Sequence, residues 1–374
     1  MTTGKLVDDF ENLLKNGLIK LADDKDTLTI PCDYMGVINP NYELKESGDA
    51  GLVLPDLPWM KYENELFDFD TTDVINMTTD VIFDSSCRYR IEDGMEKGMK
   101  MQRLDYFFAY LPNVEHFDLT NLNTDYVRSM EYMFLPTPLA QDLNLNQYVD
   151  SRDALDSLVK WVKGIIGEPE PDIRELLKEM FPPSKLKSVT VASNFAPGSA
   201  VGNGPISVKG MFSGCSQLTS IDMSKWNLNY AYNFEAMFAL CTKLSSVTFP
   251  TGFMPASGSF NNILQKDMKL EGANFAAMFF GCPNLAMVDF TGIDMTNVKD
   301  LTFTFGMCVG LTNVAFPHTE TNDFKPNALV YTFTYCLSMQ TLDLTNVDAS
   351  FMVAMMGAFA RSSNLTTIYA NENT

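Results

Sequence analysis

Apolar side chains recur at fixed offsets through the C-terminal half of this 374-residue chain. Six segments fit the pattern Phe-x-x-Cys-x-x-Leu-x-x-φ-x-φ, in which φ is an apolar residue, and they begin at Phe212, Phe238, Phe279, Phe305, Phe333 and Phe359. Ser362 replaces the cysteine in the last segment, and Met339 replaces the leucine in the fifth. Three of the five intervals are 26 residues. This periodicity predicts a solenoid, in which each coil buries its apolar face against its neighbours.

Weaker copies of the pattern lie upstream. Phe108 and Phe134 begin two of them, a shortened copy starts at Met180, and the stretch around Asp68 resembles the tail of another. The chain therefore predicts about ten coils that share one parallel sheet, with each coil contributing one strand. We expect a single right-handed solenoid over residues 62–370, with strands centred near residues 68, 118, 144, 189, 222, 248, 289, 315, 343 and 368.

One side chain of each strand, between the two φ positions, is predicted to face away from the core because side chains alternate along a strand. Down the stack this position holds Asp118, Asn144, Asp222, Thr248, Asp289, Ala315, Asp343 and Tyr369. Alternate coils carry the aspartates, which keeps them about 10 Å apart and largely screened. This strip is either a polar recognition surface or a set of turn-capping aspartates. On the first alternative, the contact residues are Asp118, Asp222, Thr248, Asp289, Asp343 and Tyr369.

Proline marks a second type of coil. The strands that end at Pro250 and Pro317 run into longer loops, because proline cannot continue a strand ladder. Insertions in a solenoid gather on one side of the stack and often carry the binding surface. We expect the loops 250–274 and 317–330 to supply binding side chains beside the exposed strip.

The five repeat cysteines are predicted to be interior, reduced and unbridged, because cysteine at such a position behaves as a small hydrophobe. They are Cys215, Cys241, Cys282, Cys308 and Cys336. A zinc site is not expected, since no CxxC pair or cysteine–histidine cluster accompanies them. The sequence indicates no metal and no other cofactor.

Two predicted helical pieces interrupt the repeats. Residues 3–21 keep an amphipathic helical spacing and either cap the first coil or anchor the chain in an assembly. Residues 146–182 contain a helix, a turn at Pro169 and Pro171, and a second helix. Short apolar runs in residues 27–60 are expected to begin the sheet as irregular strands. We therefore divide the chain into an N-terminal segment (1–61), a first repeat block (62–145), an inserted helical hairpin (146–182) and a main repeat block (183–374).

The repeats resemble the BspA-type bacterial leucine-rich repeat, whose consensus is approximately LDLSxFDTSxVTNMxxMFxxCxxL. Matching fragments run from Val288 to Leu311 and from Leu342 to Leu365. The resemblance is specific over residues 205–374 and weaker over 62–145. It implies an α/β solenoid of leucine-rich-repeat coils with a parallel sheet. It also implies a role in adhesion and binding, because members are typically surface proteins of gut and oral bacteria or of protists.

Charge and motif content narrow the chemistry. The net charge of −20 argues against nucleic acid as a partner, since phosphate binding needs a basic face. No GxSxG, HExxH or phosphate-binding GxxxxGK[ST] motif is present, and neither His116 nor His318 lies in a nucleophile motif. The carboxylates around Asp68 lack the glycine and glutamate of a calcium loop. We expect no catalytic residues, and no stretch is long and apolar enough to span a bilayer.

Three classes of function remain. The first is a non-catalytic scaffold that recognises a protein or glycan on a host or bacterial surface. The alternative is a virion structural or tail-fibre component of a phage infecting gut bacteria, whose partners are neighbouring virion proteins. The third is an enzyme whose site is completed by the helical insertion. The opening residues show no basic region followed by an apolar run, so no signal peptide is expected. The predicted locations are therefore the cytoplasm, a released virion, or a secreted form without its signal.

Overall fold

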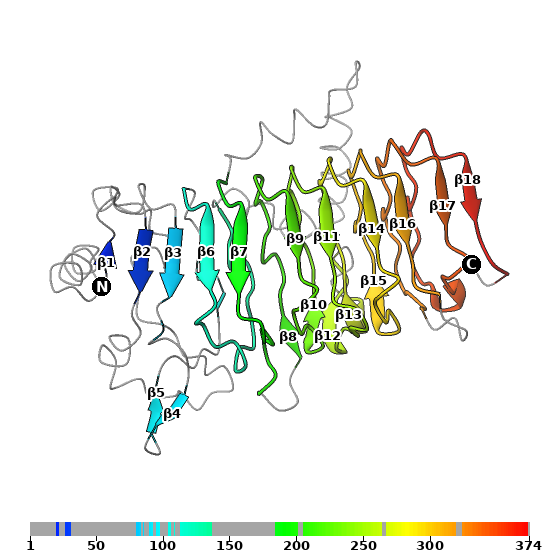
Figure 1. The fold of residues 1–374 in the computed structure, drawn as a ribbon. Helices are drawn as coiled ribbons and strands as arrows, with labels where there is room; N and C mark the ends of the chain where they lie inside the picture. The colour runs from blue at the N-terminus through cyan, green and yellow to red at the C-terminus, as the bar shows by residue number, and fades with distance from the viewer. Residues whose placement is uncertain are drawn as a thin grey trace.

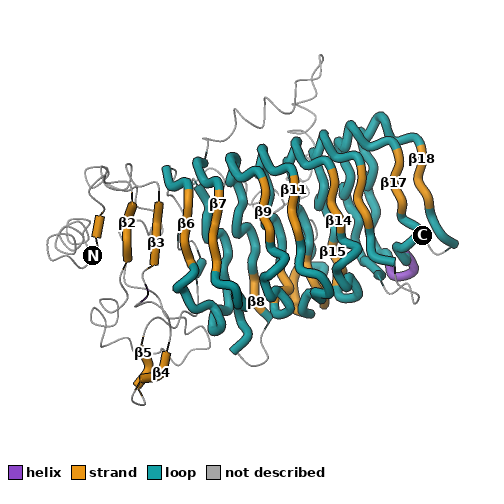
Figure 2. Tube along the Cα trace, in the orientation of Figure 1, coloured by secondary structure: helices purple, strands orange, loops and turns teal. Residues whose placement is uncertain are grey.

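The computed structural model describes the repeat-containing part of the chain and a few short strands before it. The described residues are 20–21, 27–30, 80–83, 85, 90–92, 95–97, 104–105, 108, 113–136, 184–200, 205–263, 267–318 and 324–372. They form a stack of coils in which short strands lie side by side (Figure 1). Loops and turns connect these strands, and a single turn of 3-10 helix, η3 (Ala349–Phe351), lies near the end of the stack (Figure 2).

Along one face of the stack, each coil contributes one strand to a parallel arrangement. In order along this face the strands are β2 (Thr27–Ile30), β3 (Asp80–Phe83), β6 (His116–Leu119), β7 (Ser188–Val191), β9 (Ser220–Asp222), β11 (Ser246–Thr248), β14 (Met287–Asp289), β16 (Asn313–Ala315), β17 (Thr341–Asp343) and β18 (Thr367–Tyr369). We call this row the long sheet, although its ladder is continuous only from β2 to β7 and then consists of three parallel pairs, β9 with β11, β14 with β16, and β17 with β18. In each of these three pairs, the paired residues are 26 apart in sequence. The repeat length of the sequence therefore sets the register of the sheet.

Eight of the ten predicted strand positions are confirmed, from the strand near residue 118 to the strand near residue 368. The positions near 68 and 144 lie outside the described residues. The sheet begins earlier than residue 62, because β2 pairs in parallel with β3 and β3 pairs with β6. This agrees with the expectation that the apolar runs after residue 27 start the sheet.

A second parallel ladder runs along another side of the same coils, and the repeat pattern did not predict it. It contains β8 (Ile206–Ser207), β10 (Ala231–Asn233), β13 (Lys269–Asn274) and β15 (Val298–Asp300). Isolated bridges at Ser129, Ala328 and Ala354 extend it at both ends. The strand β12 (Gly258–Asn261) pairs antiparallel with β13 as a hairpin.

Between the two ladders, each coil turns through an arc centred on its repeat phenylalanine. The residues two before and two after this phenylalanine have positive φ, for example Phe303 (57°) and Met307 (61°) around Phe305. In the arcs of Phe212, Phe238, Phe279, Phe305 and Phe333, four backbone N–H groups donate to four carbonyls of the following coil; for example, Leu301, Phe303, Phe305 and Met307 donate to Ala328, Val330, Thr332 and Thr334. The backbone itself thus holds neighbouring coils in register, and the cost of left-handed non-glycine residues is offset by these bonds.

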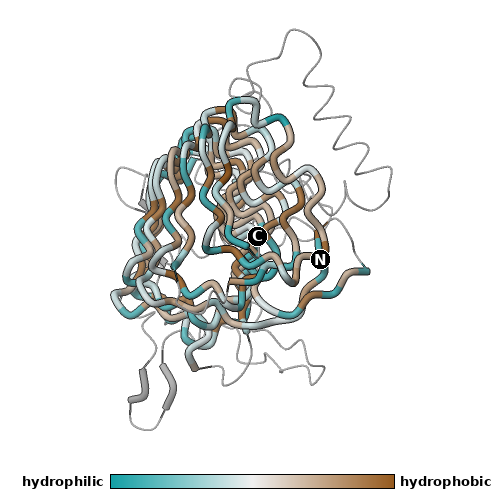
Figure 3. Tube along the Cα trace, turned by 90° about the vertical axis from the view of Figure 1, so that its right-hand side faces the viewer, coloured by the Kyte–Doolittle hydropathy of each residue, from teal (hydrophilic) through white to brown (hydrophobic). Residues whose placement is uncertain are grey.

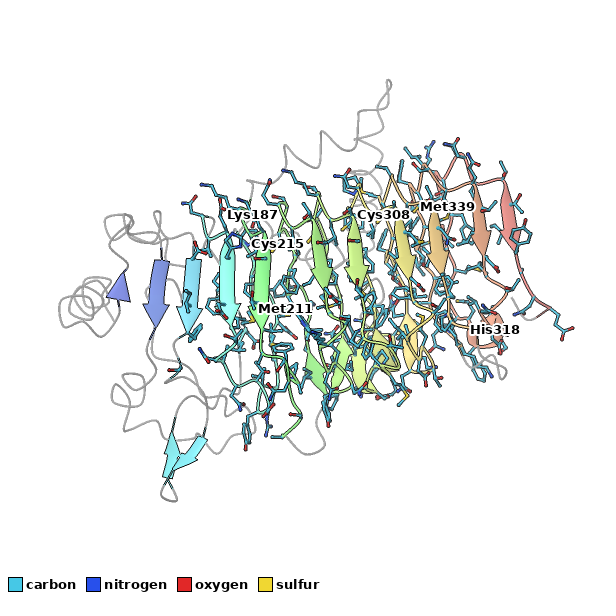
Figure 4. The ribbon with its side chains drawn as sticks, in the orientation of Figure 1. Lys187, Met211, Cys215, Cys308, His318 and Met339 are labelled. Carbon is cyan, nitrogen blue, oxygen red and sulfur yellow. The ribbon has the colours of Figure 1, made fainter. Side chains whose placement is uncertain are left out.

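The repeat phenylalanines and cysteines fill the interior. Neighbouring phenylalanine rings stack at centroid distances of 5.2 to 6.0 Å from Phe134 to Phe359. Each cysteine thiol donates a hydrogen bond to the phenylalanine carbonyl of the preceding coil, as Cys308 Sγ does to Phe279 O at 3.0 Å. Ser362 Oγ donates to Phe333 O in the same way. The five repeat cysteines are buried and free, as predicted; two of them, Cys215 and Cys308, are labelled in Figure 4.

The two predicted helical segments fall almost entirely outside the described residues. Residues 146–182 lie outside the described residues, and so does nearly all of 3–21. The last two residues of the first predicted helix, Lys20 and Leu21, form the strand β1 and pair antiparallel with β2. An edge strand leaves backbone N–H and C=O groups unpaired, and β1 supplies partners for them. The domain boundaries near 61, 145 and 182 also lie outside the described residues and remain predictions. A further antiparallel pair is formed by β4 (Arg90–Glu92) and β5 (Met95–Lys97).

The interior predicts an order of sensitivity to truncation. Leu285 and Leu311 are fully buried on neighbouring coils, so Leu285→Ala and Leu311→Ala should each cost about 2–5 kcal/mol through the cavity they leave. Cys282→Ala removes a smaller side chain and should cost less. The measurement is the free energy of unfolding from chemical denaturation. Equal losses for the cysteine and the leucines would contradict this account of the packing.

Candidate binding surface

The outward face of the long sheet carries two rows of side chains. The row nearer the carboxyl ends of the strands reads Asp118, Thr190, Asp222, Thr248, Asp289, Ala315, Asp343 and Tyr369. The other row reads His116, Ser188, Ser220, Ser246, Met287, Asn313, Thr341 and Thr367. Acidic residues therefore alternate with neutral ones, as predicted, in a surface that is otherwise rich in hydroxyl groups.

The aspartates of this face also shape the backbone. Asp118, Asp222, Asp289 and Asp343 each accept a hydrogen bond through Oδ1 from the backbone N–H two residues later, at 2.8 to 2.9 Å. This geometry is an Asx turn, which ends the strand and turns the chain. At Asp222, which is exposed, the hydrogen bond from the Ser224 N–H, together with one from the Ser224 hydroxyl, lowers the pKa of the carboxyl. Turn capping by these residues is therefore present in the structure, and it leaves their carboxylates at the surface.

A group near the start of the face was not predicted from sequence. His116 Nδ1 lies 2.7 Å from Ser188 Oγ, and His116 Nε2 lies 4.0 Å from Glu115 Oε2. The arrangement superficially resembles a serine–histidine–acid triad. Glu115, however, is bound by the Lys187 ammonium, which is the main reason that its pKa is lowered. The pair between His116 and Ser188 is also exposed. A solvated surface network accounts for these contacts.

Buried polar groups line the second ladder. Lys209 Nζ forms a 2.8 Å ion pair with Glu235, and Asn274 Nδ2 donates to the same carboxylate at 3.0 Å. Burial lowers the pKa of Lys209, but Glu235, Tyr132 and Glu131 together raise it by more, so the pKa of this ammonium lies above its ordinary value. Lys209 therefore stays charged, and the ion pair and the Asn274 hydrogen bond are made inside the fold. Glu131 lies near it, and burial raises the pKa of that carboxyl.

Asp300 is the most enclosed carboxyl of this region. Its Oδ1 accepts from the Thr302 N–H at 2.8 Å, and its Oδ2 accepts from Asn262 Nδ2 at 2.7 Å. The side chain has no exposed surface. Burial raises its pKa to about 6 even though these hydrogen bonds favour the charged form.

The proline-led loops take a different place from the one expected. Much of the loop 250–274 becomes the β12–β13 hairpin, whose Asn262 is buried against Asp300. In the loop 317–330, Phe324, Leu329 and Val330 are buried, and Ala328 bridges two coils of the second ladder. These segments extend the fold because proline ends the strand but the chain still needs backbone partners further on. The described parts of both segments therefore belong to the fold, and residues 264–266 and 319–323 lie outside the described residues.

The described part of the chain has neither a cluster of metal ligands nor a helix that could span a membrane. Among the described residues, no three histidine, cysteine, aspartate or glutamate side chains lie close enough to hold a metal ion. No helix in the described part of the chain has the length and apolar character needed to cross a membrane.

Comparison with known families agrees with the coil geometry. Residues 275–374 match a family described as "BspA type Leucine rich repeat region (6 copies)". These residues, 275–374, carry BspA-type leucine-rich repeats. Residues 59–156 and 204–249 match a second family, described as a Mycoplasma protein of unknown function, DUF285. The sequence resemblance over 205–374 is thus divided between two families.

Individual proteins resemble this chain only weakly. No curated protein matches the chain. A solved structure, described as the crystal structure of the TLR13-ssRNA13 complex, is 11% identical with a TM-score of 0.21. The match covers 92% of this chain and 50% of that one, so this chain spans about half of its length. A TM-score this low carries no argument about this protein.

The enclosed Asp300 predicts a pH dependence of stability. Because its folded pKa of about 6 lies above its ordinary value of 3.8, the folded state binds the proton more tightly. This contribution to stability is complete below about pH 4 and is lost, by on the order of 3 kcal/mol, as the pH rises through about 6.

The isosteric variant Asp300→Asn should abolish this dependence, and asparagine already occupies the equivalent positions at Asn233 and Asn274. Unfolding free energies of the two proteins, measured by denaturation at about pH 4 and about pH 7, should differ more at the higher pH, where the variant is the more stable. A constant difference between the two would contradict the assignment.

Proposed function

We propose that this leucine-rich-repeat protein is a non-catalytic scaffold that recognises a protein or glycan on a host or bacterial surface through the exposed sheet face. The main support for this proposal is the row of side chains from Asp118 to Tyr369 across the exposed face of the sheet, in which carboxylates alternate with neutral groups. The contact residues are Asp118, Asp222, Thr248, Asp289, Asp343 and Tyr369. A regular array of this kind suits a repetitive or extended partner.

The physical support comes from rigidity and from chemistry. Each carboxylate is fixed by its own Asx turn, so little conformational entropy is lost when a ligand binds. Oδ1 of Asp222, for example, is used by the fold, and the charge remains on an exposed group. Such groups attract ammonium and guanidinium side chains or accept hydrogen bonds from sugar hydroxyls. Exposed Met287 and Tyr369 add apolar contact area to the same face.

Incorporation into a larger particle, such as a virion, is the second candidate. It is favoured by the apolar side chains that remain exposed on the coil 349–372. An assembly protein needs such a contact surface, whereas a free recognition scaffold does not.

The triple variant Asp222→Asn, Asp289→Asn, Asp343→Asn tests the recognition surface. Asparagine still accepts the turn hydrogen bond through its carbonyl oxygen, so the melting temperature should stay within a few degrees. The loss of three charges should abolish binding, measured with the labelled chain on a glycan array and on intact bacterial cells.

Asp294→Asn is a matched control, since Asp294 is exposed and accepts the same turn bond from the Thr296 N–H at 3.0 Å but lies outside the sheet. It should leave binding unchanged. A triple variant that binds normally but melts at a lower temperature would assign these aspartates to the fold alone.

A further inference from the structure

The coil 349–372 has an apolar face that the described residues leave largely exposed, with Lys325 Nζ 5.9 Å from the ring centroid of Phe351; Figure 3 views the stack from this side. Phe351 is 60% exposed and Val353 is 65% exposed. One coil earlier, the positions equivalent to Met355 and Met356 are Leu329 and Val330, which are both buried. Six of the nine large hydrophobic side chains exposed in the described part of the chain belong to this coil: Phe351, Val353, Met355, Met356, Ile368 and Tyr369.

The backbone of the same coil presents a row of unused donors. In the preceding coil, the N–H groups of four residues donate to carbonyls of this one at 2.8 to 3.0 Å: Leu329, Tyr331, Phe333 and Tyr335. The equivalent residues 26 positions later are Met355, Gly357, Phe359 and Arg361. Within the described residues, none of their N–H groups has a hydrogen-bond partner. Four donors and an apolar surface thus lie on one face.

The direction of these bonds restricts what can occupy the face. In the arcs around the repeat phenylalanines, every described N–H bond between coils runs from a donor in the earlier coil to an acceptor in the later one, whereas bonds in the ladders, such as that from the Val353 N–H to Asn327 O, also run the other way. Two copies meeting through this face would oppose donor to donor, because the carbonyls of Ala354 and Met356 already accept from Leu329 and Tyr331. The other end of the sheet does not fit either, since the antiparallel β1 ends the parallel ladder there. A second copy of this chain is therefore disfavoured.

We propose that the face of coil 349–372 is a docking site for an extended segment of a partner polypeptide, which adds to the stack as a further coil. The segment supplies carbonyls to the four free N–H groups and apolar side chains to Phe351 and Met355. To follow the arc, it needs residues that tolerate positive φ, such as glycine or asparagine, on both sides of an aromatic residue. The aromatic ring would continue the phenylalanine stack on Phe359, which is only partly covered.

A synthetic peptide with the sequence of residues 353–371 is a suitable probe. It contains the glycine and the phenylalanine of the arc and no cysteine. Amide hydrogen exchange of the full chain, resolved by residue, is measured with and without millimolar peptide, because a peptide that folds on binding associates weakly. The N–H groups of Met355, Gly357, Phe359 and Arg361 should exchange freely at first and slow by about tenfold or more with the peptide.

Two methionine variants make a matched pair. Met355 and Met254 are exposed to nearly the same extent, 46% and 45%, but only Met355 lies on the proposed face. Met355→Lys should weaken peptide binding by about tenfold or more, because it removes apolar contact area. Met254→Lys should leave binding unchanged, and neither variant should alter the melting temperature appreciably.

A tandem chain in which residues 349–374 are repeated after Thr374 removes the dependence on peptide affinity, because the added segment is held at high effective concentration. Protection of the same four amides in this chain, or by the peptide, supports the proposal. Protection in neither would overturn it. Protection that already exists in the unmodified chain would also overturn it; if that protection rises with chain concentration, the occupant is a second copy.

Discussion

The fold depends on one constraint, which is that a single coil of this repeat cannot bury its apolar edge or satisfy its backbone without the next coil. Three contacts recur at the five interfaces between the coils of Phe212 and Phe359. Phenylalanine rings stack, a thiol or hydroxyl donates to a phenylalanine carbonyl, and four N–H groups donate to four carbonyls. All of them join neighbouring coils. The same constraint explains why the sheet face is rigid and why the coil 349–372 presents unused donors.

The sequence predicted the long sheet well because its signal is periodic and hydrophobic. Phe305, Cys308 and Leu311 mark one coil, and the strand that follows, β16, begins two residues after the leucine. The second ladder left no such signal, since its pairs are short and alternate with left-handed turns at bulky residues such as Phe303 and Tyr331. Those conformations are stabilised by bonds to the next coil and not by local preference. The sequence alone predicts a binding loop at 250–274, because the ladder that the β12–β13 hairpin joins leaves no periodic signal.

The candidate surface was predictable in part. Alternation along a strand placed Asp222, Asp289 and Asp343 on the exposed face, and the short side chain followed two residues later by serine or threonine indicated turn capping. Contacts between distant positions were not predictable. His116 and Ser188 are 72 residues apart, and Asn262 meets Asp300 only because an inserted hairpin folds back on the second ladder. A single sequence holds no periodic trace of either contact.

The repeat cysteines offer the most direct test of the stacked coils, because one thiol lies at each of five successive interfaces. Burial raises the pKa of every one of them, that of Cys308 to about 12, so the reactive thiolate is both scarce and enclosed. The measurement is thiol labelling of the native chain, resolved by site with mass spectrometry. The stacked-coil account predicts that Cys215, Cys241, Cys282, Cys308 and Cys336 are labelled only as fast as the coils unfold. Labelling of these thiols at the rate of the denatured chain would contradict it.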